Sequence, residues 1–412
     1  MITKPKGTYD LMGKDARIYN HIKNVVDAYA KLYNYKFLRT PVFENSELFK
    51  RGVGQTTDIV QKETYDFLDR SNREMTLRPE GTAGAVRSFI ENKMYAENPL
   101  NKLYYMGAMY RYERPGAGRY REFTQFGVEA IGSDEPLMDA EVIGISVNIL
   151  KELGIEVFVK INNLGSPEDR EKYKEALVKY LEPNLDKLCP DCQNRIKTNP
   201  LRILDCKVDG DSEILKGIPN ILEYQSEESE KRFNKVLEYL DYLEIDYEID
   251  STLVRGLDYY DYMVYELKAE VDGLSVAGGG RYNHMVKELG GPDTPCVGFA
   301  AGVERIINLL RDNYPDDNMI DVYVMAVSEE ERLKANILLQ DLRLNDIVCD
   351  ADFLNKGLKA QFKDADRNNA KQLIILNSED LSKGLINVKD NMTKEEKKVA
   401  EDEIVDYILG VI

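Results

Sequence analysis

Residues suited to binding a phosphorylated ligand are concentrated in the segment 110–129, YRYERPGAGRYREFTQFGVE. Arg111 is followed by three further arginines in and near the centre of this segment, Arg114, Arg119 and Arg121. Guanidinium groups bind phosphate oxygens in a planar, two-pronged geometry. These arginines therefore favour a site for a phosphorylated ligand, although a salt-bridged, solvent-exposed face would use the same residue types.

The spacing within this segment predicts two strands joined by a loop, because aromatic and β-branched residues alternate with polar ones on both sides of a Pro–Gly–x–Gly centre. Alternate side chains of a strand point to opposite faces, so Arg111 and Glu113 share one face. On the returning strand, the residues that share a face are Phe123, Gln125, Gly127 and Glu129. The residues of the opposite, more apolar face are Thr124, Phe126 and Val128. One face of the predicted hairpin can bind a ligand while the other packs on a core.

The segment resembles motif 2 of the class II aminoacyl-tRNA synthetases, in the form carried by histidyl-tRNA synthetases. With the motifs described below, the resemblance covers nearly the whole chain. It implies that Arg111 holds the ATP α-phosphate and the amino-acid carboxylate, that Glu113 reads the adenine, and that Phe123 stacks on the adenine ring. ATP is then a substrate, accompanied by Mg²⁺.

A second candidate segment, MTLRPEGTAGAVRSF (75–89), predicts a strand that ends at Leu77 and a helix capped by Thr82. Glu80, at the turn between them, could bind an ammonium group or could simply complement the dipole of the helix. The sequence RPEGT resembles the amino-acid loop of the histidyl enzymes. This resemblance implies that Glu80 and Thr82 bind the α-amino group of histidine, with Gly81 between them in the same site.

Two further segments, TLVRGLDYY (252–260) and AGGGRY (277–282), resemble the two histidine-specific motifs of that family. Three successive glycines let a backbone pass close beneath a ligand, where a Cβ atom would collide. The resemblance implies that Arg255 stabilises the transition state at the α-phosphate and the carboxylate. It also implies that Tyr259 and Tyr260 belong to the histidine site.

Selection of histidine requires polar groups that an apolar amino acid would leave unpaired. We expect Glu129 to accept a hydrogen bond from one imidazole N–H and Tyr260 to contact the other ring nitrogen. Gln125 would lie on the same strand face, nearer the α-amino and carboxylate end. Because a buried carboxylate is costly unless it is paired, loss of the Glu129 charge should abolish histidine recognition.

The segment GFAAGVERI (298–306) resembles motif 3, which implies that Arg305 meets the ATP γ-phosphate. Taken alone, an arginine near the start of a helix is more typical of an exposed surface. The sequence has no Gly-Lys-Ser/Thr phosphate loop and no dinucleotide-binding fingerprint after a strand. With only two histidines, His21 and His284, a Ser–His–Asp triad or a histidine-rich metal site is nearly excluded.

A chain of 412 residues should form two or three domains. We expect residues 1–318 to form an α+β catalytic domain of the class II type, an antiparallel sheet flanked by helices. The predicted helix at 14–34 and the strand at 36–43 resemble motif 1, which in the family builds the interface of a homodimer. A helical insertion at about 163–249 resembles the part that clasps the tRNA acceptor arm.

Residues 319–412 alternate between predicted strands and helices and resemble the α/β anticodon-binding domain of these enzymes. The predicted strands are 320–327, 347–350 and 371–377, and the predicted helices are 329–343, 356–368 and 394–409. A basic patch that could contact RNA comprises Lys356, Lys359, Lys363 and Arg367.

The pair Cys189 and Cys192, together with Cys206, raises the question of zinc. A structural zinc site usually has four ligands in paired spacings, so an acid such as Asp205 or Asp209 would have to supply the fourth. Packed or redox-inert cysteines are the favoured interpretation, and the predicted site includes no metal.

The composition restricts the cellular setting. Five cysteines, an odd number, indicate a reducing compartment, and the N-terminus lacks the apolar stretch of a secretory signal. We therefore expect a cytoplasmic protein without a membrane span. A net charge of −18 counts against a nucleic-acid partner, so binding of tRNA(His) is implied by the resemblance alone.

Together the motifs imply ATP-dependent attachment of histidine to tRNA(His) through a histidyl-adenylate. The alternative is a catalytically silent, histidyl-synthetase-like regulatory subunit of ATP phosphoribosyltransferase. Such paralogues erode the motifs and usually lack the C-terminal domain. Here the motif residues are all present: Glu80, Arg111, Gln125, Glu129, Arg255, Tyr260 and Arg305.

Overall fold

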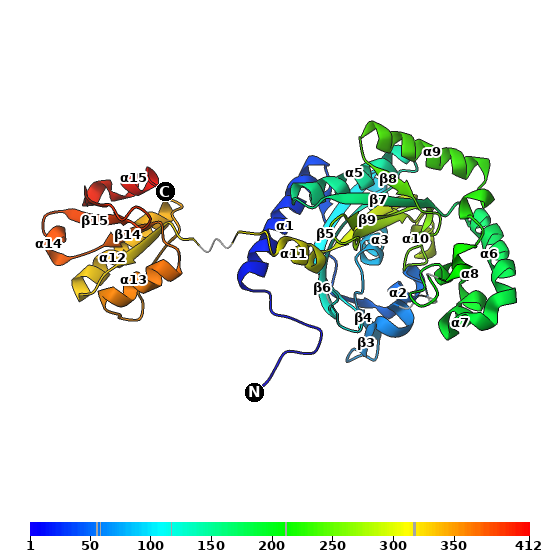
Figure 1. The fold of residues 1–412 in the computed structure, drawn as a ribbon, viewed down its shortest axis with the longest axis horizontal. Helices are drawn as coiled ribbons and strands as arrows, with labels where there is room; N and C mark the ends of the chain where they lie inside the picture. Colours follow the sequence, from blue (N-terminus) through cyan, green and yellow to red (C-terminus); the bar gives the residue numbers. More distant parts are fainter. Residues whose placement is uncertain (55–56, 58, 117, 211, 316–318) are drawn as a thin grey trace. The chain divides into compact units, whose positions relative to one another are not determined.

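The computed structural model describes residues 1–412 except for 55–56, 58, 117, 211 and 316–318 (Figure 1). The chain divides into two compact units, Met1–Tyr314 and Pro315–Ile412. Each unit has its own buried hydrophobic core. The predicted domain boundary after residue 318 lies at a stretch, 316–318, that is outside the described residues.

An eight-stranded sheet organises the first unit, and its neighbouring strands are antiparallel except for the pairs β1–β5 and β7–β8. In spatial order the strands are β1 (Lys36–Phe37), β5 (Asn101–Tyr110), β6 (Glu122–Ile131), β11 (Cys296–Gly302), β10 (Ser275–Arg281), β9 (Asp261–Ala269), β7 (Val157–Asn163) and β8 (Tyr247–Ile249). The predicted hairpin is confirmed as β5–β6. However, β5 ends at Tyr110, so Arg111 and Glu113 lie in the connecting loop and not on a strand.

Long helices pack on one face of this sheet and form the larger core of the unit (Figure 1). They are α1 (Gly13–Leu32), α5 (Pro136–Glu152), α9 (Glu227–Tyr242) and α11 (Val303–Leu310). In α1, the buried residues Ile18, Ile22, Val25 and Val26 recur at intervals of three and four, so a single stripe of the helix faces the sheet. The amphipathic helix predicted at 14–34 is thereby confirmed.

Shorter elements, all but α10 preceding the hairpin, contribute to a second core. A three-stranded antiparallel sheet has the order β2 (Phe43–Asn45), β4 (Glu74–Leu77) and β3 (Tyr65–Leu68). The helices are α2 (Ser46–Gly52), a π-helical turn (Ile59–Glu63), α3 (Thr82–Glu91), α4 (Met94–Glu97) and α10 (Met285–Glu288). The short strand β4 leads directly into the segment RPEGT, and α3 begins at the last residue of that segment.

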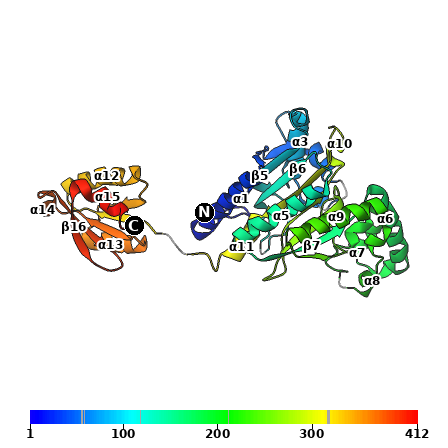
Figure 2. The ribbon, with the colours of Figure 1, turned by 90° about the horizontal axis from the view of Figure 1, so that it is seen from above.

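Between β7 and β8 the chain leaves the sheet and folds into helices, grouped beside the sheet in Figures 1 and 2. They are α6 (Pro167–Leu181), α7 (Pro190–Thr198), α8 (Glu213–Lys216), the 3₁₀ turns Glu182–Lys187, Pro200–Ile203 and Ile221–Tyr224, and finally α9. A capping box of Ser166 and Asp169 begins α6. Both α6 and α9 lie within the range 163–249 for which a helical insertion is predicted.

The second unit contains a five-stranded mixed sheet. In spatial order its strands are β13 (Cys349–Ala351), β12 (Val322–Met325), β14 (Gln372–Ile375), β15 (Leu385–Asp390) and β16 (Glu396–Ala400). Its helices are α12 (Glu329–Leu344), α13 (Leu358–Arg367), α14 (Ser378–Leu381) and α15 (Ile404–Leu409), with a 3₁₀ turn at Glu401–Glu403. Among the described helices of both units, none has the length and apolar character needed to span a bilayer.

One prediction for this unit is wrong. The helix expected at 394–409 begins only at Ile404, and residues 396–400 form the edge strand β16 instead. β16 pairs along its full length with β15, which the sequence analysis did not predict. Cross-strand pairing therefore overrides the helix propensity of the Glu–Lys-rich segment.

Candidate active site

A row of small residues crosses the centre of the large sheet. Residues directly opposite one another on neighbouring strands share a face, and one such row runs through Tyr105, Gly127, Ala300, Gly278 and Glu266. Its three middle members carry at most a methyl group. The row therefore forms a shallow floor between an aromatic residue on β5 and a carboxylate on β9.

The neighbouring row carries the carboxyl group of Glu129, which is opposite Leu103 on one side and Gly298 on the other. A Cβ atom at Gly298 would overlap Glu129 Oε2. A Cβ atom at Gly127 would approach the Tyr105 hydroxyl to 2.7 Å. Glycine at both positions thus leaves room for the polar groups above the sheet.

Glu129 is completely buried and lies among hydroxyl groups. Its carboxyl oxygens accept hydrogen bonds from Thr82 Oγ1 at 2.8 Å, from the Tyr105 hydroxyl at 3.2 Å and from the Tyr282 hydroxyl. Burial raises the pKa of Glu129 to about 8, although these hydroxyl donors act in the opposite direction. The donors to Glu129 among the described residues are hydroxyl groups, and at this pKa the carboxyl group is largely protonated at neutral pH.

Glu80 is also buried, and its two oxygens accept hydrogen bonds from the backbone amides of Thr82 (2.6 Å) and Ala83 (2.8 Å). This carboxylate therefore satisfies the first amides of α3. The prediction that Thr82 caps the helix is wrong: Gly81 is the N-cap residue, and the Thr82 hydroxyl binds Glu129. A Cβ atom at Gly81 would overlap the Tyr105 ring, so this glycine permits the close approach of β5.

Arg255 lies on the glycine floor at its β9 side, opposite Tyr105. Its guanidinium group forms an ion pair with Glu266, and a Cβ atom at Gly278 would overlap that guanidinium. Burial, the largest single influence, lowers the pKa of Arg255, but Glu266 together with Tyr260, Tyr259 and Asp205 raises it above its usual value. About a fifth of the side chain remains exposed (19%), which leaves a surface for a ligand.

Of the predicted nucleotide-binding residues, Arg111 and Glu113 lie in the loop after β5 and Phe123 lies at the start of β6. Arg111 donates a hydrogen bond from Nε to the Pro79 carbonyl (2.8 Å), and its guanidinium carbon lies 5.2 Å from the centre of the Phe123 ring. Glu113 Oε1 lies 3.8 Å from Arg111 NH1. An arginine, an aromatic ring and a carboxylate are thus grouped at one end of the floor.

Arg305, at the start of α11, donates a hydrogen bond to the Ser275 carbonyl. A Cβ atom at Gly118 would lie 3.2 Å from Arg305 Cγ, so the hairpin loop reaches this arginine. Burial and the neighbouring Arg119 lower the pKa of Arg305. Two arginines this close together would favour a negatively charged ligand.

Tyr259, Tyr260 and Tyr282 form an aromatic wall. The ring centres of Tyr259 and Tyr260 are 4.6 Å apart, and those of Tyr259 and Tyr282 are 5.6 Å apart. Gln125 lies opposite Gly302 at the edge of the floor. Within the described part of the chain, its buried Oε1 atom has no hydrogen-bond partner, which is typical of a group that awaits a ligand.

Sequence reasoning missed several residues of this arrangement: Tyr105, Tyr282, Glu266 and Glu304. Glu304 accepts hydrogen bonds from the Thr124 amide (2.8 Å) and the Tyr9 hydroxyl (3.1 Å) and so ties α11 to the hairpin. Tyr282 follows the triple glycine after one intervening residue and could have been found there. Tyr105 and Glu266 depend on the pairing register of the strands, for which the sequence carries no direct signal.

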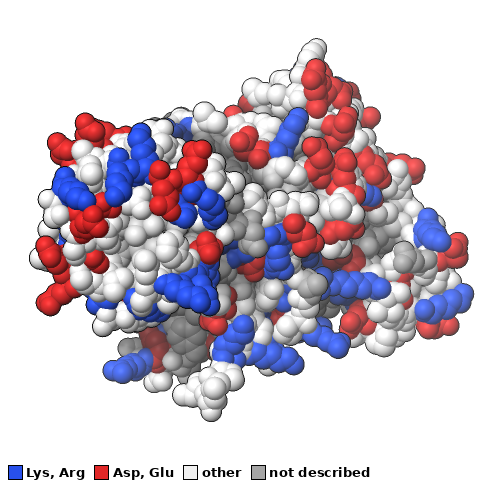
Figure 3. Space-filling model, turned by 60° about the vertical axis from the view of Figure 1, so that its left-hand side comes forward, with Lys and Arg blue, Asp and Glu red and all other residues white. Residues whose placement is uncertain are grey.

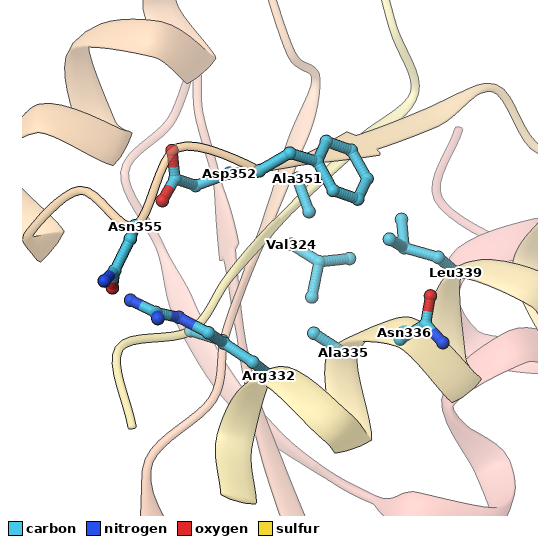
Figure 4. A pocket seen from close by; sticks show the side chains of 10 residues that line it. Val324, Arg332, Ala335, Asn336, Leu339, Ala351, Asp352 and Asn355 are labelled. Atoms are coloured by element: carbon cyan, nitrogen blue, oxygen red, sulfur yellow. The ribbon is translucent and has the colours of Figure 1, made fainter. Parts of the chain in front are cut away.

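Hollows also lie outside the floor among the described residues. One, of about 440 Å³, is lined by Tyr259 together with charged residues of both signs, which include Lys50, Arg51, Asp258 and Glu288. Another, of about 330 Å³, lies in the second unit between α12 and the ends of β12 and β13 (Figure 4). In that hollow, Arg332 points toward Asn355, and Leu339 and Ala335 form the apolar side. Acidic and basic side chains are intermingled over the face shown in Figure 3.

An antiparallel sheet with these motif residues on one face, followed by a separate α/β unit, defines a class II aminoacyl-tRNA synthetase. Within that class, the chain belongs to the histidyl-tRNA synthetase family, because the family model for histidyl-tRNA synthetase matches residues 7–306. The model of an anticodon binding domain matches residues 321–410.

Relatives agree with this assignment over the full length. The chain is 46% identical to the histidine–tRNA ligase of Bacillus cytotoxicus over 413 residues, which is 98% of each chain. It is 47% identical to the histidine–tRNA ligase of Bacillus subtilis, with 97% of each chain covered. The crystal structure of apo Staphylococcus aureus histidyl-tRNA synthetase matches with a TM-score of 0.83 at 37% identity and covers 99% of this chain and 100% of that one. These relatives favour the enzyme over the regulatory-subunit alternative.

Proposed function

We propose that the chain activates histidine with ATP to histidyl-adenylate and transfers the histidyl group to tRNA(His). The observation that carries this proposal is the cluster of Glu129 with the hydroxyls of Thr82, Tyr105 and Tyr282, beside a glycine floor that ends at Arg255. A buried carboxyl group can form a hydrogen bond with a polar ring, and an apolar amino acid could not form that bond.

Histidine would lie on the floor with its imidazole at Glu129 and Tyr260. Glu80, Gly81 and Thr82, with Gln125, would surround its α-amino group, and Tyr259 would cover the side chain. In support, the unpaired Gln125 oxygen lies on the same strand face as Glu129.

The nucleotide would occupy the end of the floor at the hairpin loop. Arg111 would bind the α-phosphate and the histidine carboxylate, Glu113 the adenine, and Phe123 would stack on the adenine ring. Arg305 would meet the γ-phosphate. The burial of Arg305 beside Arg119 supports this role, because a phosphate would relieve the repulsion between the two cations.

In the first step, the histidine carboxylate oxygen attacks the ATP α-phosphorus and pyrophosphate leaves. Such a transfer needs positioning and charge stabilisation rather than covalent assistance. Arg255 would stabilise the charge that develops on the α-phosphate, and Glu266 would hold that guanidinium in place. In the second step, a terminal ribose hydroxyl of the tRNA attacks the histidyl carbonyl and AMP leaves.

Mg²⁺ would accompany ATP. The carboxylate of Glu266 is partly exposed at the floor (19%), and Mg²⁺ is usually bound by one or two carboxylates together with phosphate oxygens. When bound, the ion would neutralise phosphate charge.

For tRNA, we propose that residues 1–318 form the catalytic domain, that the insertion at about 163–249 contacts the acceptor arm, and that residues 319–412 bind the anticodon. The predicted basic patch, which lies in and just before α13, is partly neutralised, because Lys356 and Arg367 both pair with Asp364. The hollow of Figure 4 lies at the carboxyl ends of parallel strands, where sheets of this kind bind ligands.

We also propose a cytoplasmic homodimer. All five cysteines are free, as in a reducing compartment. The short strand β1 is the edge of the large sheet, and Phe37 and Phe43 nearby are more than half exposed, at 58% and 54%. An exposed apolar edge of this kind suits a subunit interface, and light scattering of the purified protein would test it.

The decisive experiment supplies purified protein with ATP, labelled histidine and total tRNA. The proposal predicts label on tRNA and histidine-dependent exchange between ATP and pyrophosphate. Exchange without label on tRNA would indicate a ligase that forms the adenylate for another acceptor, and no exchange would contradict the proposal.

A further inference from the structure

Outside the candidate active site, the insertion gathers three cysteines and one aspartate. One sulfur or carboxylate oxygen each from Cys189, Cys192, Cys206 and Asp209 lie within 4.8 Å of one another. Cys189 Sγ is 3.7 Å from Cys206 Sγ, and Cys206 Sγ is 3.8 Å from Asp209 Oδ2. Four ligands of these types are the number that a closed tetrahedral metal site requires.

The distance between the sulfurs distinguishes a shared ion from a covalent bond. A disulfide requires about 2.05 Å, and all five cysteines are free. In a tetrahedral zinc site with Zn–S bonds of about 2.3 Å, neighbouring sulfurs are about 3.8 Å apart. The 3.7 Å between Cys189 and Cys206 corresponds to an edge of that tetrahedron.

The ligands also have paired spacings. Cys189 and Cys192 lie at the start of α7, and Cys206 and Asp209 have the same separation in the turn that follows the 3₁₀ helix Pro200–Ile203. Each pair presents two ligand atoms from one tight backbone segment, as structural zinc sites do. Of the two acids left open by the sequence, the structure brings Asp209 to the cysteines.

The environment of Asp209 favours the binding of a positive charge. Its side chain is 7% exposed, and its oxygens accept hydrogen bonds from the Cys189 amide at 3.0 and 3.3 Å. Across the residues that the structure describes, it forms no ion pair with a lysine, arginine or histidine. Because a buried carboxylate is costly unless it is paired or coordinates a metal, a cation among the sulfurs would resolve the imbalance.

We propose that Cys189, Cys192, Cys206 and Asp209 bind one Zn²⁺ ion, which closes the segment 189–209 into a loop. Binding replaces three thiol protons, which leave to solvent as the Zn–S bonds form, and no electron is transferred. The ion is structural, because all four positions are filled by the protein and none remains for a substrate.

This loop contacts the segment that carries Arg255. Asn199 Nδ2 donates a hydrogen bond to Asp258 Oδ1 (2.9 Å), and Arg202 NH1 donates one to the Arg255 carbonyl (3.1 Å). Asn199 and Arg202 therefore position the segment that carries Arg255, and the ion would fix the loop to which both residues belong. This consequence rests on the proposed role of Arg255, whereas the metal assignment does not.

The metal content of the full chain tests the site directly. The protein, purified in reductant without chelator, incubated with zinc and dialysed, is analysed by inductively coupled plasma mass spectrometry. We expect about one zinc per chain, near-complete loss in Cys192→Ser, and full retention in the control Cys349→Ser, whose thiol lies in the second unit. Trace zinc in the wild type, iron in its place, or a Cys189–Cys206 disulfide would overturn the proposal.

Two further measurements test the site even if the serine variant misfolds. Asp209→Asn keeps the shape of the side chain but removes its charge, and zinc affinity measured by competition with a chromophoric chelator should fall at least about tenfold. Cobalt added to the zinc-free wild type should give the thiolate charge-transfer and strong visible bands of tetrahedral Co(II). An octahedral cobalt spectrum, or unchanged affinity in Asp209→Asn, would contradict the site. If zinc binds but its removal leaves the adenylation rate unchanged, only the coupling to Arg255 fails.

Discussion

At the scale of single residues, the ionisation of Glu129 should make the stability of the folded protein depend on pH. Burial raises its pKa from 4.5 to about 8, so between these values the folded protein holds a proton that the unfolded chain releases. The folded state therefore loses stability as pH rises through this window. Glu129→Gln removes the titration, and its unfolding free energy relative to wild type should rise between pH 5 and 8, by about 1 kcal/mol or more.

Denaturant unfolding at a series of pH values measures this difference. Glu122→Gln, an exposed carboxylate on the same strand, is the matched control and should show no such trend. Parallel curves for Glu129→Gln and wild type would show that the group does not titrate in this range. In the same variants, histidine-dependent exchange should be lost in Glu129→Gln and in Glu129→Ala, and an unchanged rate would exclude Glu129 from recognition.

Arg255 should act on the rate rather than on binding. In Arg255→Ala, the adenylation rate should fall by roughly two orders of magnitude or more, since one preorganised charge can contribute that much. The affinity for histidine should change far less. Single-turnover kinetics separates the two quantities. Because Glu266 loses its partner in this variant, Arg255→Ala/Glu266→Gln serves as the control: recovered stability without recovered rate supports the catalytic role, and near-normal turnover in either variant contradicts it.

At the scale of elements, the floor of the site depends on strand positions that carry no side chain. The three heavy atoms nearest to a Cβ atom at Gly278 belong to the Arg255 guanidinium group. Gly278→Ala should therefore displace this guanidinium from Glu266, which lowers the stability somewhat and the adenylation rate about tenfold or more. Gly357→Ala, where a Cβ atom meets nothing within 4 Å, is the control. Equal rates in the two variants would show that the floor tolerates a methyl group.

Elements with strong local patterns could be predicted from the sequence, and elements defined by their partners could not. The apolar period of α1 and the alternation in β6 are contained in the segments themselves. β16 is a strand because it pairs with β15 across the Asp390–Lys394 turn, although its Glu and Lys residues favour a helix. Similarly, the motifs revealed Glu129 and Arg255, but their partners Tyr105 and Glu266 follow from strand register.

At the scale of the whole molecule, the two units have separate cores and should retain separate functions. A chain cut after Tyr314 should keep histidine-dependent exchange, because every residue of the candidate active site precedes that point. Charging of tRNA should fall at least about a hundredfold, since the second point of attachment is lost. Comparing exchange and charging in the truncated and full chains measures both. Charging at the full rate would show that the second unit does not bind tRNA.

The hydroxyl ring around Glu129 has a consequence for the form of ligand that can enter. Neutral imidazole exists as two tautomers, which exchange the N–H and the bare nitrogen between the two ring positions. A carboxyl group with a pKa of about 8 is available near neutrality both as a proton donor and as an acceptor. In the proposed contact between Glu129 and the imidazole, the carboxyl group could present the form complementary to either tautomer, so capture would not have to wait for a proton to move within the ring.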